Sequence, residues 1–298
     1  MHHRHSSSTA RLIARCSLLA ASEPSLSALV PADAEEALTA MLRADGGIGW
    51  FGFAVRHAGT RALLRRIEGA ILPGIIAHFL ARKRWIERAV LSALDEGCRQ
   101  VVVIGAGLDT LAWRLHRARP GVTFWELDHP ASQLPKADAL RRLTHSDNLA
   151  LVPLDLRTAL PSAALVKDPR FQPSRRTCFV AEGLFMYLPE SRVLAVLADA
   201  TQFEGARVVF TFMELDATGK AAFRGGSPLI EKWLQARSEP FVWAIPRGQL
   251  ADFVAPLGLL VRSVAGADEL RTEILGPAGL TNSALAAGEC VAMLSRNS

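Results

Sequence analysis

The sequence contains few cysteines, and none are spaced as metal ligands. Its four cysteines are scattered, and no Cys-x-x-Cys or His-Glu-x-x-His motif occurs in the 298 residues. Protein metal sites usually show such close spacing, so we expect no metal. Three of the cysteines lie in apolar stretches, which indicates reduced, buried thiols and predicts a cytoplasmic protein.

Long apolar runs and concentrated charge are also absent. The longest apolar stretch, residues 69–81, is too short to span a bilayer and contains a proline, so we expect no membrane partner. The net charge of +5 comes from scattered arginines. A nucleic-acid-binding protein more often gathers its positive charge on one face, so we expect no nucleic-acid partner. Half of the residues are hydrophobic, which is typical of a globular protein with a sizeable core.

Short β-rich runs alternate with helical stretches from about residue 100. The predicted strands are 100–105, 122–127, 149–154, 177–182 and 207–213, and the predicted helices between them are 108–118, 131–144, 156–166 and 190–202. This alternation predicts right-handed crossovers and a parallel sheet, and the apolar strands predict cover on both faces. A helix over 246–256 and strands over 259–265 and 289–295 predict an antiparallel pair at one edge.

The first 96 residues show a different pattern. They have helical periodicity, broken by prolines and by a glycine cluster at 45–49, which predicts either a loop near a substrate entrance or an ordinary turn. We interpret residues 1–96 as a helical cap on a Rossmann-like core of residues 97–298. The two parts together form one domain over 1–298.

A glycine turn follows the first predicted strand, in VVVIGAGLDT at residues 101–110. Glycine lets the backbone approach a ligand closely, and open α/β sheets bind ligands at the carboxyl ends of their strands. Glu126 and Asp128 follow at the end of the next strand. An acid about twenty residues after such a turn is typical of one that binds ribose hydroxyls.

Two residues of this turn bear on the choice of cofactor. A dinucleotide-binding turn needs a third glycine, but Thr110 stands there. Asp109 places negative charge near a helix N-terminus that a pyrophosphate would occupy. Both residues favour S-adenosylmethionine, which has no phosphate, over a nicotinamide dinucleotide. An NAD-dependent oxidoreductase remains an alternative.

Four motifs occur in order along the chain: VVVIGAGLDTLAWRL, FWELDHPASQLPKADAL, VPLDLR and FVAEGLFMYLPE. Together they resemble the leucine carboxyl methyltransferase family, and most closely its bacterial branch of O-methyltransferases linked to polyketide biosynthesis. The resemblance implies a class I methyltransferase fold, with a Rossmann-like, seven-stranded, mostly parallel sheet, an antiparallel last strand and an N-terminal helical cap. It also implies S-adenosyl-L-methionine as the cofactor and S-adenosyl-L-homocysteine as the product.

The resemblance also implies roles for individual residues. Arg82, in the helix before the first strand, would bind the methionine carboxylate, although an exposed basic helix face is an alternative for it. The other implied contacts are Gly105, Ala106, Gly107 and Asp109 at the methionine end, Asp128 and then Glu126 at the ribose, Asp155 and Leu156 at the adenine with Arg157 completing their motif, and Glu182 at the methionine amine and the reacting centre.

The methyl acceptor decides whether a base is needed. An ionised carboxylate needs none, whereas a hydroxyl benefits from a proton acceptor. The candidates are His129, Tyr187 and Glu214. We favour a cap of the next helix for His129 over a chemical role, and Tyr187, the sole tyrosine, fits a packing role at least as well. The aromatic residues Trp233, Phe241 and Trp243 would line an acceptor pocket or belong to the core.

We therefore predict an S-adenosylmethionine-dependent O-methyltransferase that acts on the hydroxyl or carboxyl of a small, apolar, polyketide-like metabolite. Two further alternatives stay open. One is a carboxyl methyltransferase of a protein or peptide C-terminus, and the other is a non-catalytic relative that binds cofactor. The sequence is compatible with a monomer or a homodimer.

Overall fold

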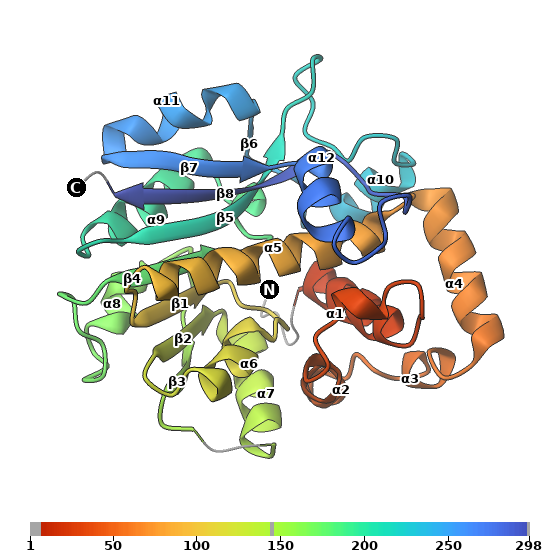
Figure 1. Cartoon of the computed structure of the whole chain (residues 1–298), viewed down its shortest axis with the longest axis horizontal. Coiled ribbons are helices and arrows are strands. Elements are labelled where there is room, and N and C mark those ends of the chain that lie inside the picture. The colour runs from red at the N-terminus through yellow and green to blue at the C-terminus, as the bar shows by residue number, and fades with distance from the viewer. Residues whose placement is uncertain (1–6, 144–145, 297–298) are drawn as a thin grey trace.

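The computed structural model describes residues 7–143 and 146–296, and its strands form one sheet (Figure 1). The strands are β1 (Gln100–Ile104), β2 (Thr123–Asp128), β3 (Leu149–Pro153), β4 (Thr177–Ala181), β5 (Arg207–Glu214), β6 (Ala244–Ile245), β7 (Leu259–Ala265) and β8 (Glu289–Arg296). Every predicted strand is present. The short β6 was not predicted, because two residues leave no periodic signal.

The strand order is β3-β2-β1-β4-β5-β8-β7, with β6 paired to β5. Neighbouring strands from β3 to β5 run parallel. Strand β8 inserts antiparallel between β5 and β7. This topology confirms the predicted class I methyltransferase sheet, which is mostly parallel with an antiparallel last strand.

Helices precede, connect and cover the strands. The α-helices are α1 (Ser8–Ala21), α2 (Ala34–Ala44), α3 (Phe51–Ala54), α4 (Ala58–Ile71), α5 (Ile75–Asp95), α6 (Leu111–Ala118), α7 (Pro130–Arg141), α8 (Pro161–Leu165), α9 (Glu190–Thr201), α10 (Leu229–Ala236), α11 (Leu250–Val254) and α12 (Ala267–Leu270). Shorter helical turns include η1 (Ser27–Leu29) and η2 (Phe185–Tyr187). None of the helices in the described part of the chain is long and apolar enough to cross a membrane.

Several helix boundaries differ from the prediction. The helix predicted at 108–118 begins only at Leu111, because the residues before it continue the glycine turn. The helix predicted at 156–166 shrinks to α8, which starts at Pro161. The helix predicted at 131–144 ends at Arg141, and residue 144 lies outside the described residues. The helix predicted at 246–256 is divided into 3-10 turns around α11.

The sheet is buried on both faces. Along β1, Val101 and Val103 pack with residues of α1, α2, α5 and α6, whereas Val102 and Ile104 pack with residues of α8, α9 and α11. Alternation of this kind follows from the two-residue period of a strand. It explains why the strands are almost continuously apolar, as the sequence predicted.

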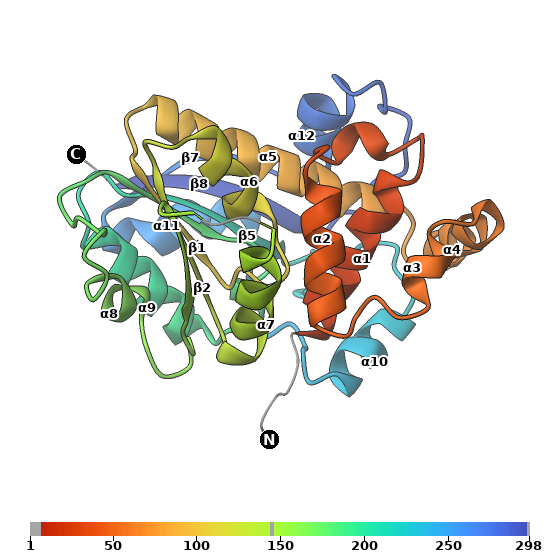
Figure 2. The same cartoon turned by 90° about the horizontal axis from the view of Figure 1, so that it is seen from below.

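The remaining helices lie beyond one end of the strands. In Figure 1 the arrow of β7, which runs in the same direction as β5, points towards the side where α1, α2, α3, α4 and α10 gather. Figure 2 shows the same helices beside that end of the sheet from a second direction. These helices therefore face the carboxyl ends of the parallel strands, where α/β proteins bind ligands.

Candidate functional site

Two cavities lie at the carboxyl edge of the sheet. The first, of about 260 Å³, contains the turn at Gly105–Gly107 in its wall, and we call it the turn cavity. The second, of about 580 Å³, is lined mainly by aliphatic and aromatic side chains of α1, α4, α5 and α10, and we call it the apolar cavity. Thr9, Ile13, Arg82, Gly183 and Tyr187 line both cavities, and we call this shared region the junction.

Helix α1 separates the two cavities. Its residues Ala10, Ala14 and Ser17 face the turn cavity, and a second set faces the apolar cavity, comprising Ser8, Arg11, Leu12, Arg15, Cys16 and Leu19. The three- and four-residue steps within each set follow the helical repeat, so each set forms one face of the helix. One helix thus supplies a wall to both cavities.

The glycine turn holds its shape through backbone and carboxylate contacts. Gly105 and Gly107 have φ angles of 68° and 48°. A Cβ atom on Gly105 would lie 2.9 Å from the Leu184 side chain. Asp128 accepts hydrogen bonds from the backbone N–H groups of Gly107 and His129, each at 2.6 Å. The acid at the end of β2 is therefore fixed directly against the turn.

Glu126 lies away from the turn cavity, inside the protein. Its Oε2 is 2.7 Å from the ammonium nitrogen of Lys136, and both side chains are almost completely buried. Burial raises the pKa of Glu126 to about 7, although Lys136 opposes this shift. Lys136 also donates to the carbonyl of Asp109 at 2.6 Å. Glu126 therefore anchors the lysine that supports the turn from behind.

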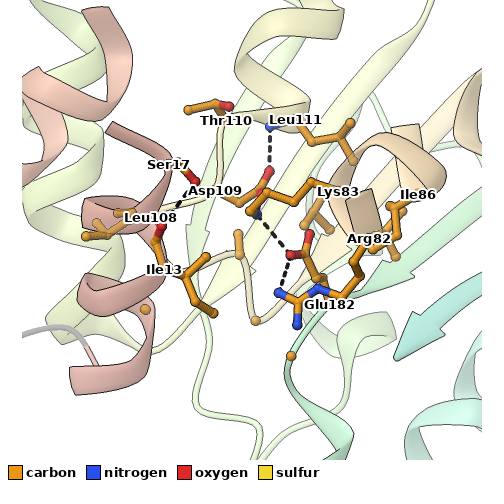
Figure 3. A pocket seen from close by; sticks show the side chains of 18 of the residues that line it. Ile13, Ser17, Arg82, Lys83, Ile86, Leu108, Asp109, Thr110, Leu111 and Glu182 are labelled. Carbon is orange, nitrogen blue, oxygen red and sulfur yellow. Dashed lines mark hydrogen bonds and ion pairs between the residues drawn. The ribbon is translucent and has the colours of Figure 1, made fainter. Parts of the chain in front are cut away.

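A chain of ion pairs crosses the junction, and Figure 3 shows its part from Asp109 through Lys83 and Glu182 to Arg82. Arg82 donates through Nη2 to Glu182 Oε1 at 2.6 Å and through Nη1 to both carboxylate oxygens of Glu289 at 2.6 and 2.7 Å. His78 contacts the same Glu289 carboxylate at 3.0 Å. Burial raises the pKa of Glu289, but Arg82 and His78 outweigh it and lower the pKa to about 2.

Lys83 continues this chain into the turn cavity. Its ammonium group lies 3.0 Å from Glu182 Oε1 and also pairs with Asp109. The side chain of Lys83 is 24% exposed, whereas that of Arg82 is 3% exposed. Asp109 in turn accepts a hydrogen bond from the N–H of Leu111 in the first turn of α6, at 2.5 Å. A carboxylate thus occupies the helix N-terminus that a pyrophosphate would need.

The structure brings most of the predicted site residues together. Those that line the turn cavity are Arg82, Gly105, Ala106, Gly107, Asp109, Asp128, Glu182 and Tyr187. Those that do not line it are Glu126, His129, Asp155, Leu156 and Arg157. Glu126 is in the buried interior, His129 follows β2, and the other three follow β3, which is an edge strand two positions away from β1.

Several candidate residues are held by contacts outside the turn cavity. The Asp155 carboxylate binds the Arg157 guanidinium at 2.7 Å, and this hydrogen bond lowers the pKa of Asp155 to about 2. His129 caps α7, since its Nδ1 accepts from the N–H of Ala131 at 3.2 Å. The capping alternative for His129 is therefore confirmed. Glu214, the third candidate base, pairs with Arg224 at 2.6 Å and does not line either cavity.

Tyr187 lies at the junction with its hydroxyl near α1. Burial raises the pKa of Tyr187, and the Thr9 side chain hydrogen-bonds to it. The Thr9 hydroxyl accepts from Tyr187, because its own proton is donated to Glu239 at 2.5 Å. Glu239 also accepts from the N–H groups of Ser8 and Thr9 at 2.9 and 3.0 Å. Glu239, which follows α10, therefore caps the first turn of α1 and holds this helix over both cavities.

Three residues with clear places in the site were missed by the sequence analysis. Lys83 directly follows the predicted Arg82, but a single lysine in a helical stretch does not show in the sequence whether it faces a cavity. Glu239 and Glu289 are 230 and 207 residues away from their partners Thr9 and Arg82. No local sequence pattern predicts pairings over such distances. Of the three predicted aromatic residues, Trp233 and Phe241 line the apolar cavity, whereas Trp243 is buried in the core.

Comparison with known proteins defines the class. Residues 34–201, more than half of the chain, match the family model of leucine carboxyl methyltransferases, so the chain belongs to this family. A Mycobacterium tuberculosis protein named "Putative S-adenosyl-L-methionine-dependent methyltransferase" is 29% identical over 213 residues. The match covers 68% of this chain and 60% of that protein, so the chain spans about 60% of the length of this relative.

Two further similarities agree with the sequence match and the fold. A Mycobacterium marinum protein of the same name is 37% identical over 123 residues, which cover 41% of this chain and 38% of that protein. The crystal structure of a "duf574 family protein" from Streptomyces avermitilis shares the fold with a TM-score of 0.59. That match has 14% identity and covers 98% of each chain.

Proposed function

We propose that this protein is an S-adenosyl-L-methionine-dependent O-methyltransferase that methylates a hydroxyl group on a small, apolar, polyketide-like metabolite. The observation that carries the proposal is the junction, where a cavity of paired charges meets an apolar cavity. Family membership and the names of the mycobacterial relatives support the cofactor.

The polar groups of the turn cavity fit this cofactor. S-adenosylmethionine would supply an electrophilic methyl group on a sulfonium, together with an amino acid end and a ribose. Asp128 lies against the glycine turn, where its carboxylate can accept hydrogen bonds from the ribose hydroxyls. Glu182 and Asp109 offer carboxylates to the amine. The proposed adenine contacts of Asp155 and Leu156 rest on the family resemblance, since neither residue lines the cavity.

We assign the methionine carboxylate to Lys83 rather than to Arg82. Both terminal nitrogens of Arg82 are already bound by the Glu182 and Glu289 carboxylates. Lys83 lines the cavity and is the more exposed of the two cations. Arg82 then acts as a positioning residue that orients Glu182.

The charges at the junction favour a hydroxyl acceptor over a carboxylate. Arg82 is flanked there by two carboxylates, those of Glu182 and Glu289. A carboxylate acceptor would face both of them and find both terminal nitrogens of the guanidinium occupied, whereas a neutral hydroxyl avoids this repulsion. Tyr187 stays protonated because its pKa is raised, and its hydroxyl oxygen can accept a hydrogen bond from the acceptor hydroxyl and so orient it. Holding the reactants in line would supply much of the rate acceleration.

Two observations weigh against the alternative functions. The Asp109 carboxylate at the N-terminus of α6 opposes a dinucleotide pyrophosphate. The apolar cavity has a mainly aliphatic and aromatic lining that suits a small apolar molecule, whereas the backbone of a protein C-terminus would need polar partners along its length.

Radiolabelled methyl transfer tests the proposal. The protein would be incubated with methyl-labelled S-adenosylmethionine and a panel of hydroxylated aromatic acceptors, and the products would then be treated with mild base. We expect label that survives base, because aryl and alkyl ethers are stable to it. Label released as methanol would identify a methyl ester. The acceptor group would then be a carboxyl and not the proposed hydroxyl. An absence of S-adenosylhomocysteine binding by calorimetry would overturn the cofactor assignment itself.

A further inference from the structure

We propose that the acceptor carries a carboxylate at the end of its apolar body remote from the methylated oxygen, and that Arg11 and Arg15 bind this carboxylate inside the apolar cavity. The acceptor class is then an apolar hydroxy acid that is methylated on its hydroxyl. The inference rests on the proposed function, because it takes the apolar cavity as the acceptor site.

The first observation is a buried donor without a partner. Arg11 and Arg15 both line the apolar cavity from α1. Arg11 donates through Nε to the buried carboxylate of Asp45 at 2.5 Å, but its Nη2 is buried and has no hydrogen-bond partner among the described residues. A buried N–H left unsatisfied costs about 1–3 kcal/mol, so a ligand oxygen at this nitrogen would stabilise the complex.

The second observation is an excess of positive charge. Arg15 donates through Nε to the carbonyl of Gly47 at 2.8 Å and has no ion-pair partner within the described part of the chain. Burial lowers the pKa of Arg15, and the neighbouring Arg11 lowers it further. Two guanidinium groups four residues apart on a helix repel each other. With Asp45 paired to Arg11, the cluster matches one additional negative charge, as on a carboxylate.

The third observation is the place of this cluster in the cavity. Thr9 marks the junction, and Arg15 lies six residues further along α1. At 1.5 Å per residue, Arg11 is therefore roughly 3 Å along the helix from Thr9, and Arg15, at the far end of the cluster, is roughly 9 Å from it. Between them, the cavity walls are apolar and include Leu12, Phe79 and Trp233. The acceptor should accordingly have its hydroxyl and its carboxylate separated by a rigid apolar body of about this length.

A purely structural role for Arg11 and Arg15 would give a different pattern of ligand affinities in their variants. Arg11 and Arg15 also hold the loop after α2, through Asp45 and Gly47, and Arg15 lies over the Phe51 ring. If this were their whole function, substitution would weaken the binding of charged and neutral ligands alike. Comparing an acid with its own methyl ester in each variant separates carboxylate recognition from a general loss of cavity shape.

The test uses the full chain saturated with S-adenosylhomocysteine and two probes in calorimetry. The probes are 4′-hydroxybiphenyl-4-carboxylate, which carries a hydroxyl and a carboxylate at opposite ends, and its methyl ester. We expect the wild-type protein to bind the acid at least tenfold more tightly than the ester. Arg11→Met and Arg15→Met should each abolish most of this preference, and Arg11→Lys should retain part of it. Arg66→Met, an exposed substitution on α4 outside the cavity lining, is the control and should keep the preference.

Two results would overturn the inference. One is equal affinity of the wild-type protein for acid and ester, and the other is a preference for the acid that survives both Arg→Met substitutions. Repeating the titrations without S-adenosylhomocysteine separates this inference from the proposed function. A protein that does not bind S-adenosylhomocysteine refutes the proposed cofactor, whereas the acid-to-ester ratio reports on the arginine cluster alone.

Discussion

The two cavities on either side of α1 are built in different ways. The turn cavity is formed by the carboxyl ends of strands, a glycine turn and a connected chain of ion pairs from Asp109 to Glu289. The apolar cavity is formed mainly by side chains of α1, α4 and α5, which precede the first strand, and of α10, which lies between β5 and β6. The turn cavity, where we propose that the cofactor binds, is fixed by backbone geometry, whereas the apolar cavity, proposed for the acceptor, is defined by side-chain shape. Substitutions should therefore affect the two sides separately, except at the junction.

Breaking the ion pairs at the junction should have the largest effect, because both cavities share them. Glu289→Gln leaves the buried Arg82 guanidinium with one carboxylate fewer, and removing one partner of a buried pair typically costs ~3–5 kcal/mol. Urea denaturation at pH 7 would measure this loss of stability. A loss below about 1 kcal/mol would show that the junction does not depend on Glu289.

The loss of stability caused by Glu289→Gln should depend on pH. The pKa of Glu289 is about 2 in the folded protein, below its ordinary value of 4.5. Its contribution to stability is therefore fully present above about pH 4.5 and is lost as the pH falls towards 2. Glu289→Gln should flatten the stability curve in this window. A variant with the same acid sensitivity as the wild type would contradict the assignment.

Asp128→Ala should affect the turn cavity alone. Asp128 accepts two backbone hydrogen bonds at the turn and is proposed to bind the ribose, and hydrogen bonds to charged groups contribute about 1.5–3 kcal/mol. Affinity for S-adenosylhomocysteine should fall at least tenfold by calorimetry, while the hydroxybiphenyl probe binds as before. Asp138→Ala, at an exposed position on α7, should change neither affinity. An unchanged cofactor affinity in Asp128→Ala would rule out the ribose contact.

Lys83→Gln should affect only the part of the turn cavity that we propose binds the amino acid end of the cofactor. Loss of the ammonium should weaken S-adenosylhomocysteine binding roughly tenfold, since charge-assisted hydrogen bonds of this kind are among the stronger ones. Binding of 5′-methylthioadenosine, which lacks the amino acid end, should be unchanged. An equal loss for both ligands would mean that Lys83 only maintains the shape of the cavity.

Tyr187→Phe should have the smallest effect. The hydroxyl contributes a single neutral hydrogen bond at the junction, of about 0.5–1.5 kcal/mol, so methyl transfer should slow by no more than about tenfold. Because the pKa of Tyr187 is raised, the pH profile of the rate between pH 6 and 9 should keep its shape. A profile that loses a titration in Tyr187→Phe would show instead that Tyr187 acts as the base.

The same contrast explains what the sequence could predict. The strands, the glycine turn and the strand-end acids Asp128 and Glu182 have local signals, because the carboxyl ends of parallel strands meet at one edge. Asp155 obeys the same rule but follows the edge strand β3 and pairs with Arg157, so it lies outside the cavity. The apolar cavity depends on how α1, α4 and α10 pack. Their apolar residues predict burial but not what they surround.

The two-faced character of α1 also bears on how such proteins diversify. The positions that face the two cavities alternate along a single helix, so Leu12, Cys16 and Leu19 can change while Ala10, Ala14 and Ser17 stay the same. Under the proposed function, a few substitutions within these fourteen residues would change the acceptor without loss of the methyl donor. Libraries restricted to this one face of α1 are accordingly an economical starting point for changing the ligand of the apolar cavity alone.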